Sequence, residues 1–151
     1  LQERNMKIQL IGFIDELPES TKQVVLKAVE DTKDNTGMVL TFALNYGSRA
    51  EIIEATKALA NEVKSGEISV EDINDEVFAS KLQTSFLGNL QDPDLMIRTS
   101  GEVRLSNFLL WQLAYSEYYF TDIFWPDFSE EDLHKAILTY QGRHRRYGGL
   151  A

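Results

Sequence analysis

Between Asp92 and Glu117 the chain reads Asp-Pro-Asp-Leu-Met-Ile-Arg-Thr-Ser-Gly-Glu-Val-Arg-Leu-Ser-Asn-Phe-Leu-Leu-Trp-Gln-Leu-Ala-Tyr-Ser-Glu. A short apolar run at 95–97 leads into a polar loop with two arginines and several hydroxyls, and a long apolar segment comes next. We expect a strand over 95–98, a loop, and a helix from about 107 to 119. That layout places an anion site at the carboxyl end of a sheet.

The polar loop carries side chains suited to a phosphate or diphosphate. Arg98 and Arg104 each offer a planar fork of donors, and hydroxyls and backbone amides can satisfy the remaining oxygen lone pairs. The alternative is a solvated loop in which these arginines form exposed ion pairs with Glu102, which would contribute little. Spacing alone leaves both interpretations open.

Strands and helices alternate along the rest of the chain. Strand-like runs lie at 6–13 and 38–46, and the second is almost continuously apolar, as in a parallel strand covered on both faces. Helices are expected from about 20 to 34, 48 to 65, 69 to 82 and 129 onward, with capping boxes at Ser20/Gln23 and Ser48/Glu51 and caps at Ser69 and Ser129. The residues expected to face inward are Val25, Ala28, Val29, Ile52, Ala55, Leu59, Val63, Leu133, Ala136, Ile137 and Tyr140. The pattern predicts an α/β fold with a mostly parallel sheet flanked by helices.

The composition sets limits on function. A chain of 151 residues is expected to form a single domain over 1–151. Its net charge of -9 argues against nucleic-acid binding, which needs a basic surface. The absence of cysteine excludes disulfides and thiolate metal sites. With no membrane-length apolar run and no signal peptide, we expect a cytoplasmic protein, and the start at Leu1 suggests a truncated or processed end.

Several motifs resemble those of the cis-prenyltransferases, most closely the bacterial undecaprenyl diphosphate synthases. They are the segments 97–102, 104–112, 114–117 and 125–128, together with 43–47 and the tail at 146–149. The resemblance implies an undecaprenyl diphosphate synthase-like fold and repeated cis addition of isopentenyl diphosphate to farnesyl diphosphate with Mg²⁺. It also implies a homodimer, a product that serves as a lipid carrier precursor for cell-wall synthesis, and peripheral membrane contact during product release.

The resemblance also implies roles for individual residues. Those that would bind the substrate diphosphates are Arg98, Arg104, Leu105, Ser106, Arg146 and Gly148, the last two completing the partner subunit's site. Glu117 matches the carboxylate associated with Mg²⁺. The family's first strand, its Asp-containing diphosphate loop and its tunnel helices have no counterpart in these residues, so no catalytic residue is assigned.

The distance along the chain between Ser106 and Glu117 bears on the metal. Eleven residues of straight helix would separate them by roughly 16 Å. Either the chain bends after Ser106, or the two residues serve sites separated by the dimer interface. Two rival functions stay open: a non-catalytic diphosphate-binding or dimerisation fragment, and a different phosphate-handling α/β enzyme. The second lacks support because the chain has no Walker or G-x-G-x-x-G signature.

Overall fold

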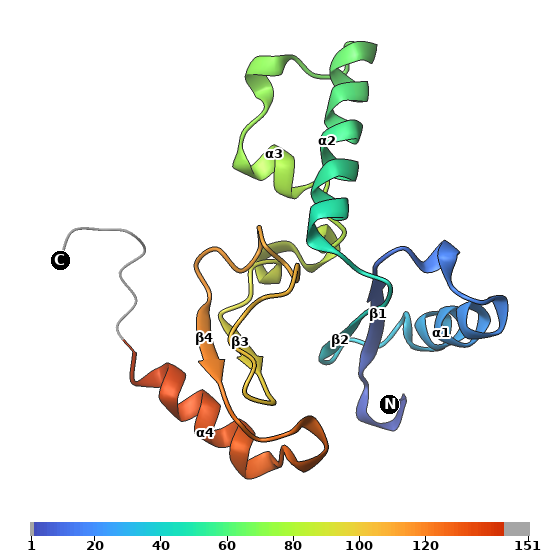
Figure 1. The fold of residues 1–151 in the computed structure, drawn as a ribbon. Helices are drawn as coiled ribbons and strands as arrows, with labels where there is room; N and C mark the ends of the chain where they lie inside the picture. Colours follow the sequence, from blue (N-terminus) through green and yellow to red (C-terminus); the bar gives the residue numbers. More distant parts are fainter. Residues whose placement is uncertain (1, 144–151) are drawn as a thin grey trace. The chain divides into compact units, whose positions relative to one another are not determined.

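The computed structural model describes residues 2–143, and Figure 1 shows the order of their elements. The chain divides after Phe86 into two compact units. The first contains β1, α1, β2, α2 and α3, and the second contains β3, β4 and α4. Each unit has one parallel strand pair, with α1 packed against β1 and α4 against β4, which confirms the predicted α/β fold. The single domain over 1–151 stays a prediction.

In the first unit, β1 (Lys7–Ile11) pairs in parallel with β2 (Val39–Ala43). The helix between them, α1 (Glu19–Thr32), is fastened to β1 by its last residue. The Thr32 hydroxyl accepts a hydrogen bond from the Ile8 N–H at 2.9 Å and donates to the carbonyl of the preceding turn at 2.8 Å. Both residues are buried, so this contact lies in the core of the unit. Short 3-10 turns precede and follow β1 as η1 (Gln2–Arg4) and η2 (Ile14–Glu16).

The predicted start of α1 is wrong. The helix begins at Glu19, directly after Pro18, so Ser20 lies inside the first turn and cannot cap it. The Gln23 amide instead donates to the Glu19 carboxylate at 3.1 Å. The prediction that β2 is covered on both faces is also wrong within this chain, because Val39 and Phe42 are exposed.

The start of α2 (Ser48–Ser65) also differs from the prediction. Its N-cap residue is Gly47, and Glu51 is buried instead of reaching back to the helix start. The Glu51 carboxylate accepts hydrogen bonds from the Gln83 N–H at 2.8 Å and from the Tyr46 hydroxyl. The predicted inward face is confirmed at its centre, where Ala55 and Leu59 are buried, and the predicted end is confirmed at Gly66, which has a φ of 78°.

The helix predicted over 69–82 is interrupted. A 3-10 turn, η3 (Val70–Asp72), is capped by the predicted Ser69, and α3 (Asp75–Ala79) starts afresh with the Asn74 side chain as its cap. Extended backbone at Ile73 and Asn74 separates the two pieces. The next segment contains η4 (Ser85–Leu90), which is kinked at Gly88.

In the second unit, β3 (Leu95–Arg98) is confirmed and pairs in parallel with β4 (Glu117–Phe120). The helix predicted over 107–119 is wrong: the connection 99–116 consists of loop and turns, and the last residues of the predicted helix belong to β4. The physical reason is the backbone. Ser106, Asn107 and Leu109 have φ values of 50°, 65° and 44°, which a right-handed helix cannot accommodate.

After β4 the chain forms η5 (Trp125–Asp127) and then α4 (Glu130–Gln141). The predicted cap of α4 is confirmed, because Ser129 and Asp132 form a reciprocal capping box. Of the predicted inward stripe, Ala136 is fully buried, whereas Leu133 and Ile137 are exposed. Among residues 2–143, no helix has the length and apolar character needed to cross a membrane.

Candidate anion-binding site

The loop that leaves β3 is fastened to the segment that leaves β4. The Ser100 and Gly101 amides donate to the carbonyls of Ile123 at 2.8 Å and Thr121 at 3.0 Å. Both donors have positive φ values, and a Cβ added at Gly101 would lie 3.2 Å from the Asp122 carboxylate. These two amides are therefore used within the protein. Because no helix follows the loop, an anion here depends on side chains and not on a helix N-terminus.

Arg98 is the fixed cation of the loop. Its Nη1 donates to the backbone carbonyl of Arg104 and lies 3.2 Å from the Ser106 hydroxyl. The side chain leaves the last residue of β3, so its base is held by the strand while its tip is held by the turn at 104–106. Because the side chain is held at its base and at its tip, the guanidinium keeps one orientation. Its other N–H groups can still donate to a ligand.

Arg104 is held less firmly than Arg98. It forms an ion pair with Glu102, and the two side chains are 64% and 40% exposed. The exposed ion pair with Glu102, which was the alternative to an anion site, is therefore present for Arg104. Exposed pairs of this kind contribute little to stability, so a diphosphate that offers more charge can compete with Glu102 for the guanidinium.

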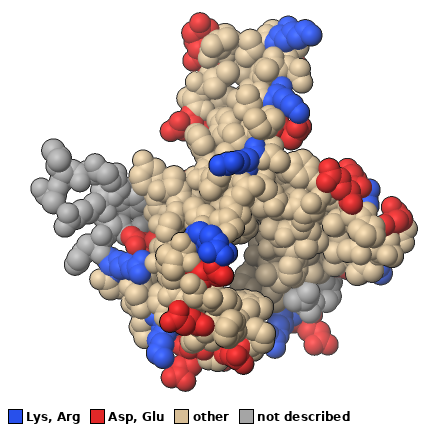
Figure 2. Space-filling model, in the orientation of Figure 1, with Lys and Arg blue, Asp and Glu red and all other residues tan. Residues whose placement is uncertain are grey.

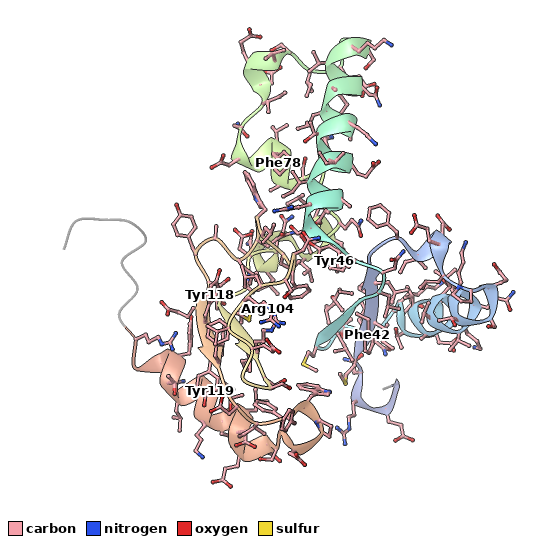
Figure 3. The ribbon with its side chains drawn as sticks, in the orientation of Figure 1. Phe42, Tyr46, Phe78, Arg104, Tyr118 and Tyr119 are labelled. Atoms are coloured by element: carbon pink, nitrogen blue, oxygen red, sulfur yellow. The ribbon has the colours of Figure 1, made fainter. Side chains whose placement is uncertain are left out.

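Arg98, Arg104 and Leu105 line a common pocket of about 240 Å³ on the second unit. Its other lining residues, which the sequence interpretation did not single out, are Met96, Ile97 and Phe108. Figure 3 labels Arg104, whose side chain is exposed at this pocket. Two cations beside an apolar wall suit a ligand with a diphosphate head and a hydrocarbon body. The structure thus groups four of the predicted residues, since Ser106 contacts Arg98.

Glu117 does not belong to this pocket. The register pairs Glu117 with Leu95 and Phe120 with Arg98, so the carboxylate and the guanidinium leave opposite ends of the strand pair. Side chains alternate between the faces of a sheet, and paired residues share a face, so Glu117 and Arg98 also lie on opposite faces. The straight-helix distance was based on a helix that the structure lacks, but the separation of the two residues is real.

The Glu117 carboxylate is instead bound by Arg143, just beyond α4. Arg143 Nη1 lies 2.9 Å from Glu117 Oε2 and donates to the Tyr118 carbonyl at 2.7 Å. The sequence analysis did not single out Arg143 and missed this contact. No pattern in the sequence indicates it, because the two residues are far apart in the chain and Glu117 was assigned to a helix. Arg146 and Gly148, also predicted as binding residues, lie outside the described residues.

The described residues supply little for a metal ion. Within 2–143, no group of three or more histidine or acidic side chains is arranged to hold one. A lone carboxylate is nevertheless a usual protein contribution to a Mg²⁺ site, since substrate phosphates and water complete the octahedron. Glu117 is paired with Arg143 and its side chain is 24% exposed, so its role as a metal ligand stays a prediction.

The surface charges give no sign of a general polyanion site. On the face drawn in Figure 2, lysine and arginine side chains are interspersed with acidic ones. With a net charge of -9, an anionic ligand has to be held by a local group of cations. The Arg98–Arg104 pocket is such a group.

A family model described as "Putative undecaprenyl diphosphate synthase" matches residues 1–148. The chain belongs to this family. It is similar to an isoprenyl transferase of Halalkalibacterium halodurans, with 56% identity over 99% of this chain and 57% of the relative. It is also similar to the ditrans,polycis-undecaprenyl-diphosphate synthase of Micrococcus luteus, described as farnesyl-diphosphate specific, with 57% identity over 99% of this chain and 59% of the relative.

Solved structures give the same result for the fold. A lavandulyl diphosphate synthase from Lavandula x intermedia, in complex with dimethylallyl diphosphate, has a TM-score of 0.93 and 38% identity, covering 97% of this chain and 61% of that one. A probable undecaprenyl diphosphate synthase from Campylobacter jejuni has a TM-score of 0.82 and 30% identity. The match covers 98% of this chain and 65% of that one. The undecaprenyl diphosphate synthase-like fold is thereby confirmed. The chain spans less than two thirds of the length of each of these four proteins.

Proposed function

We propose that the full-length protein is a cis-prenyltransferase that adds isopentenyl diphosphate units to farnesyl diphosphate and yields undecaprenyl diphosphate, a lipid carrier precursor for cell-wall synthesis. The observation that carries this proposal is the pocket in which Arg98 and Arg104 stand beside an apolar wall, with Ser106 on Arg98. The family and the names of the two bacterial relatives support the choice of substrates.

In this proposal the pocket binds the diphosphate of the incoming isopentenyl unit. Arg98, held by the 104–106 turn, presents its fork in one orientation, and Arg104 exchanges Glu102 for the ligand. The apolar wall formed by Met96 and Phe108 receives the hydrocarbon part. None of these residues is a general base. Their contribution to the rate is to hold the nucleophilic double bond in place.

The remaining parts of the proposal rest on the family resemblance. Mg²⁺, when bound, offsets the charge that develops on a departing diphosphate. Glu117 is the carboxylate this chain would offer it, and Arg146 and Gly148 would complete the diphosphate site of a partner subunit in a homodimer. We place the reaction in the cytoplasm, with peripheral membrane contact when the long apolar product is released.

For the 151-residue chain by itself, diphosphate binding without turnover is the second candidate. The residues lining the pocket include no carboxylate, and the chain spans 57–59% of its two bacterial relatives. The departing diphosphate of the allylic substrate would then have to be bound by residues other than those that line this pocket.

Incorporation of labelled isopentenyl diphosphate tests both candidates. Full-length protein, the 151-residue chain and full-length Arg104→Ala are each incubated with farnesyl diphosphate and Mg²⁺, and product length is read by chromatography. We expect a long polyprenyl product from the full-length protein, a large loss with Arg104→Ala, and binding without product from the short chain. A folded full-length protein that binds nucleotides in preference to isopentenyl diphosphate would contradict the proposal.

A further inference from the structure

The turn at 105–109 contributes to both the polar and the apolar parts of the Arg98–Arg104 pocket. Its Ser106 hydroxyl lies 3.2 Å from Arg98 Nη1, and the side chains of Leu105 and Phe108 line the pocket. One short turn therefore sets the position of the apolar wall relative to the cation that would hold a diphosphate. That relative position decides how long a hydrocarbon the pocket can accept.

The backbone on both sides of Phe108 is unusual. Asn107 and Leu109 have φ values of 65° and 44°, a region that residues with bulky side chains rarely adopt. Such a conformation persists only where the surrounding contacts hold it. Here the Phe108 N–H donates to the Leu105 carbonyl at 3.2 Å. Leu109 is buried, and its carbonyl accepts the Leu113 N–H at 2.9 Å, so the backbone of Phe108 is held from both sides.

The pocket that Phe108 lines is small. Its volume of about 240 Å³ lies below the roughly 300–1,000 Å³ that is usual for pockets enclosing drug-sized ligands. A five-carbon diphosphate is smaller than such ligands, whereas a fifteen-carbon diphosphate is as large as they are. Phe108 is 40% exposed, so an apolar ligand can still cover its ring.

Resting on the proposed function, we propose that Phe108 is the specificity-determining residue of this pocket: its ring ends the space for hydrocarbon after five carbons. The diphosphate is held by Arg98 and Arg104, so a ligand with a longer hydrocarbon has to displace the ring or withdraw from the arginines. Either change loses contacts. An apolar pocket discriminates by about 10- to 200-fold for each methylene that it is not built to accept.

The test is isothermal titration of the full-length protein with inorganic diphosphate, isopentenyl diphosphate and 3-propylbut-3-enyl diphosphate, a homologue with two more methylenes. The unreactive analogue farnesyl thiolodiphosphate is present at saturation, so the allylic site is filled and no turnover occurs. We expect wild type to bind isopentenyl diphosphate about 100-fold more tightly than the homologue, and Phe108→Ala to reduce this ratio below about tenfold. Affinity for inorganic diphosphate should stay within about twofold, because both arginines are unchanged.

Phe86→Ala is the matched control. Phe86 is 44% exposed and is not among the residues that line the pocket, so its loss should leave the ratio at the wild-type value. Phe108→Leu shortens the side chain less, should give an intermediate ratio, and serves if the alanine variant does not fold. A ratio in the Phe108 variant equal to that of Phe86→Ala would overturn the inference. So would a loss of inorganic diphosphate binding, because Phe108 would then support the arginines and not limit the hydrocarbon.

Failure of the proposed function gives a different result. In that case wild-type protein binds no isopentenyl diphosphate, or Arg104→Ala binds it as tightly as wild type. If both of these measurements agree with the proposed function while Phe108→Ala keeps the wild-type ratio, the function stands and only the inference about Phe108 falls.

Discussion

The contact between Arg98 and Ser106 gives the sharpest test of the anion pocket. Arg98→Gln removes a cation and the donor to the 104–106 turn, whereas Ser106→Ala removes a hydroxyl and leaves the cation in place. Hydrogen bonds to charged groups contribute about 1.5–3 kcal/mol and neutral ones about 1 kcal/mol. The dissociation constant for isopentenyl diphosphate should therefore rise about 10- to 100-fold in Arg98→Gln and about fivefold in Ser106→Ala.

The double variant tests the geometry itself. Because Arg98 Nη1 lies 3.2 Å from the Ser106 hydroxyl, removal of either side chain weakens the hold on the other. The double variant should lose less binding free energy than the sum of the single variants, by about 0.5 kcal/mol or more. Arg98→Lys keeps the charge but not the planar fork and should fall between wild type and Arg98→Gln.

Isothermal titration of full-length protein with isopentenyl diphosphate, without farnesyl diphosphate, measures these constants directly. Lys135→Gln on α4 controls for the loss of one positive charge, and a thermal melt of each variant controls for folding. If Arg98→Gln melts like wild type and binds isopentenyl diphosphate within twofold of it, the pocket is not the binding site. If the losses of binding free energy in the two single variants add up to the loss in the double variant, the contact with Ser106 does not orient Arg98.

Three further predictions concern the stability of the full-length protein. Gly12→Ala would place a methyl carbon 1.8 Å from the Leu44 carbonyl oxygen at a φ of 116°, so we expect the unfolding free energy in a urea titration to fall by about 3 kcal/mol. Glu51→Leu removes a buried acceptor of two hydrogen bonds and should lower the unfolding free energy by about 2–4 kcal/mol in the same titration. Glu51→Gln should lower it less. Equal losses in the two variants would show that the acceptor is unimportant. The Ser129 hydroxyl and backbone N–H hold the pKa of Asp132 below its ordinary value, so its charge stabilises the fold above about pH 4 and this contribution is lost as the pH falls through the lowered pKa. Melting temperatures of wild type and Asp132→Asn should therefore differ at pH 7 and converge as the pH falls below the lowered pKa of Asp132.

The elements with local signals were predictable from the sequence. Ser69 and Ser129 cap helices because their partners, Asp72 and Asp132, lie three residues ahead and can satisfy the first backbone amides. Ser48 has the same local pattern and does not act as a cap, because its partner Glu51 is drawn into the core by a backbone amide more than thirty residues away. A capping box is thus predictable only where no distant donor competes for the acid.

The helix predicted over 107–119 was wrong because a local pattern did not determine the structure there either. An apolar run of this length indicates burial but cannot distinguish a helix from buried turns that lead into a strand. Positive φ values at Ser106, Asn107 and Leu109 break the helical path, and Tyr118 and Phe120 then belong to a strand, where aromatic residues are favoured. The grouping of Arg98, Arg104 and Leu105 was unaffected by this error, because it depends on the end of β3 and the loop and not on the conformation of 107–119.

The strand pair β3–β4 divides the predicted residues between its two faces. Arg98 lies at the carboxyl end on one face and Glu117 at the amino end on the other, about 10 Å apart along the strands. A diphosphate held by Arg98 and Arg104 therefore cannot meet the Glu117 carboxylate of the same chain through a bridging metal. If Glu117 acts on a metal–diphosphate complex, that diphosphate must be bound by a second chain or by residues outside 2–143.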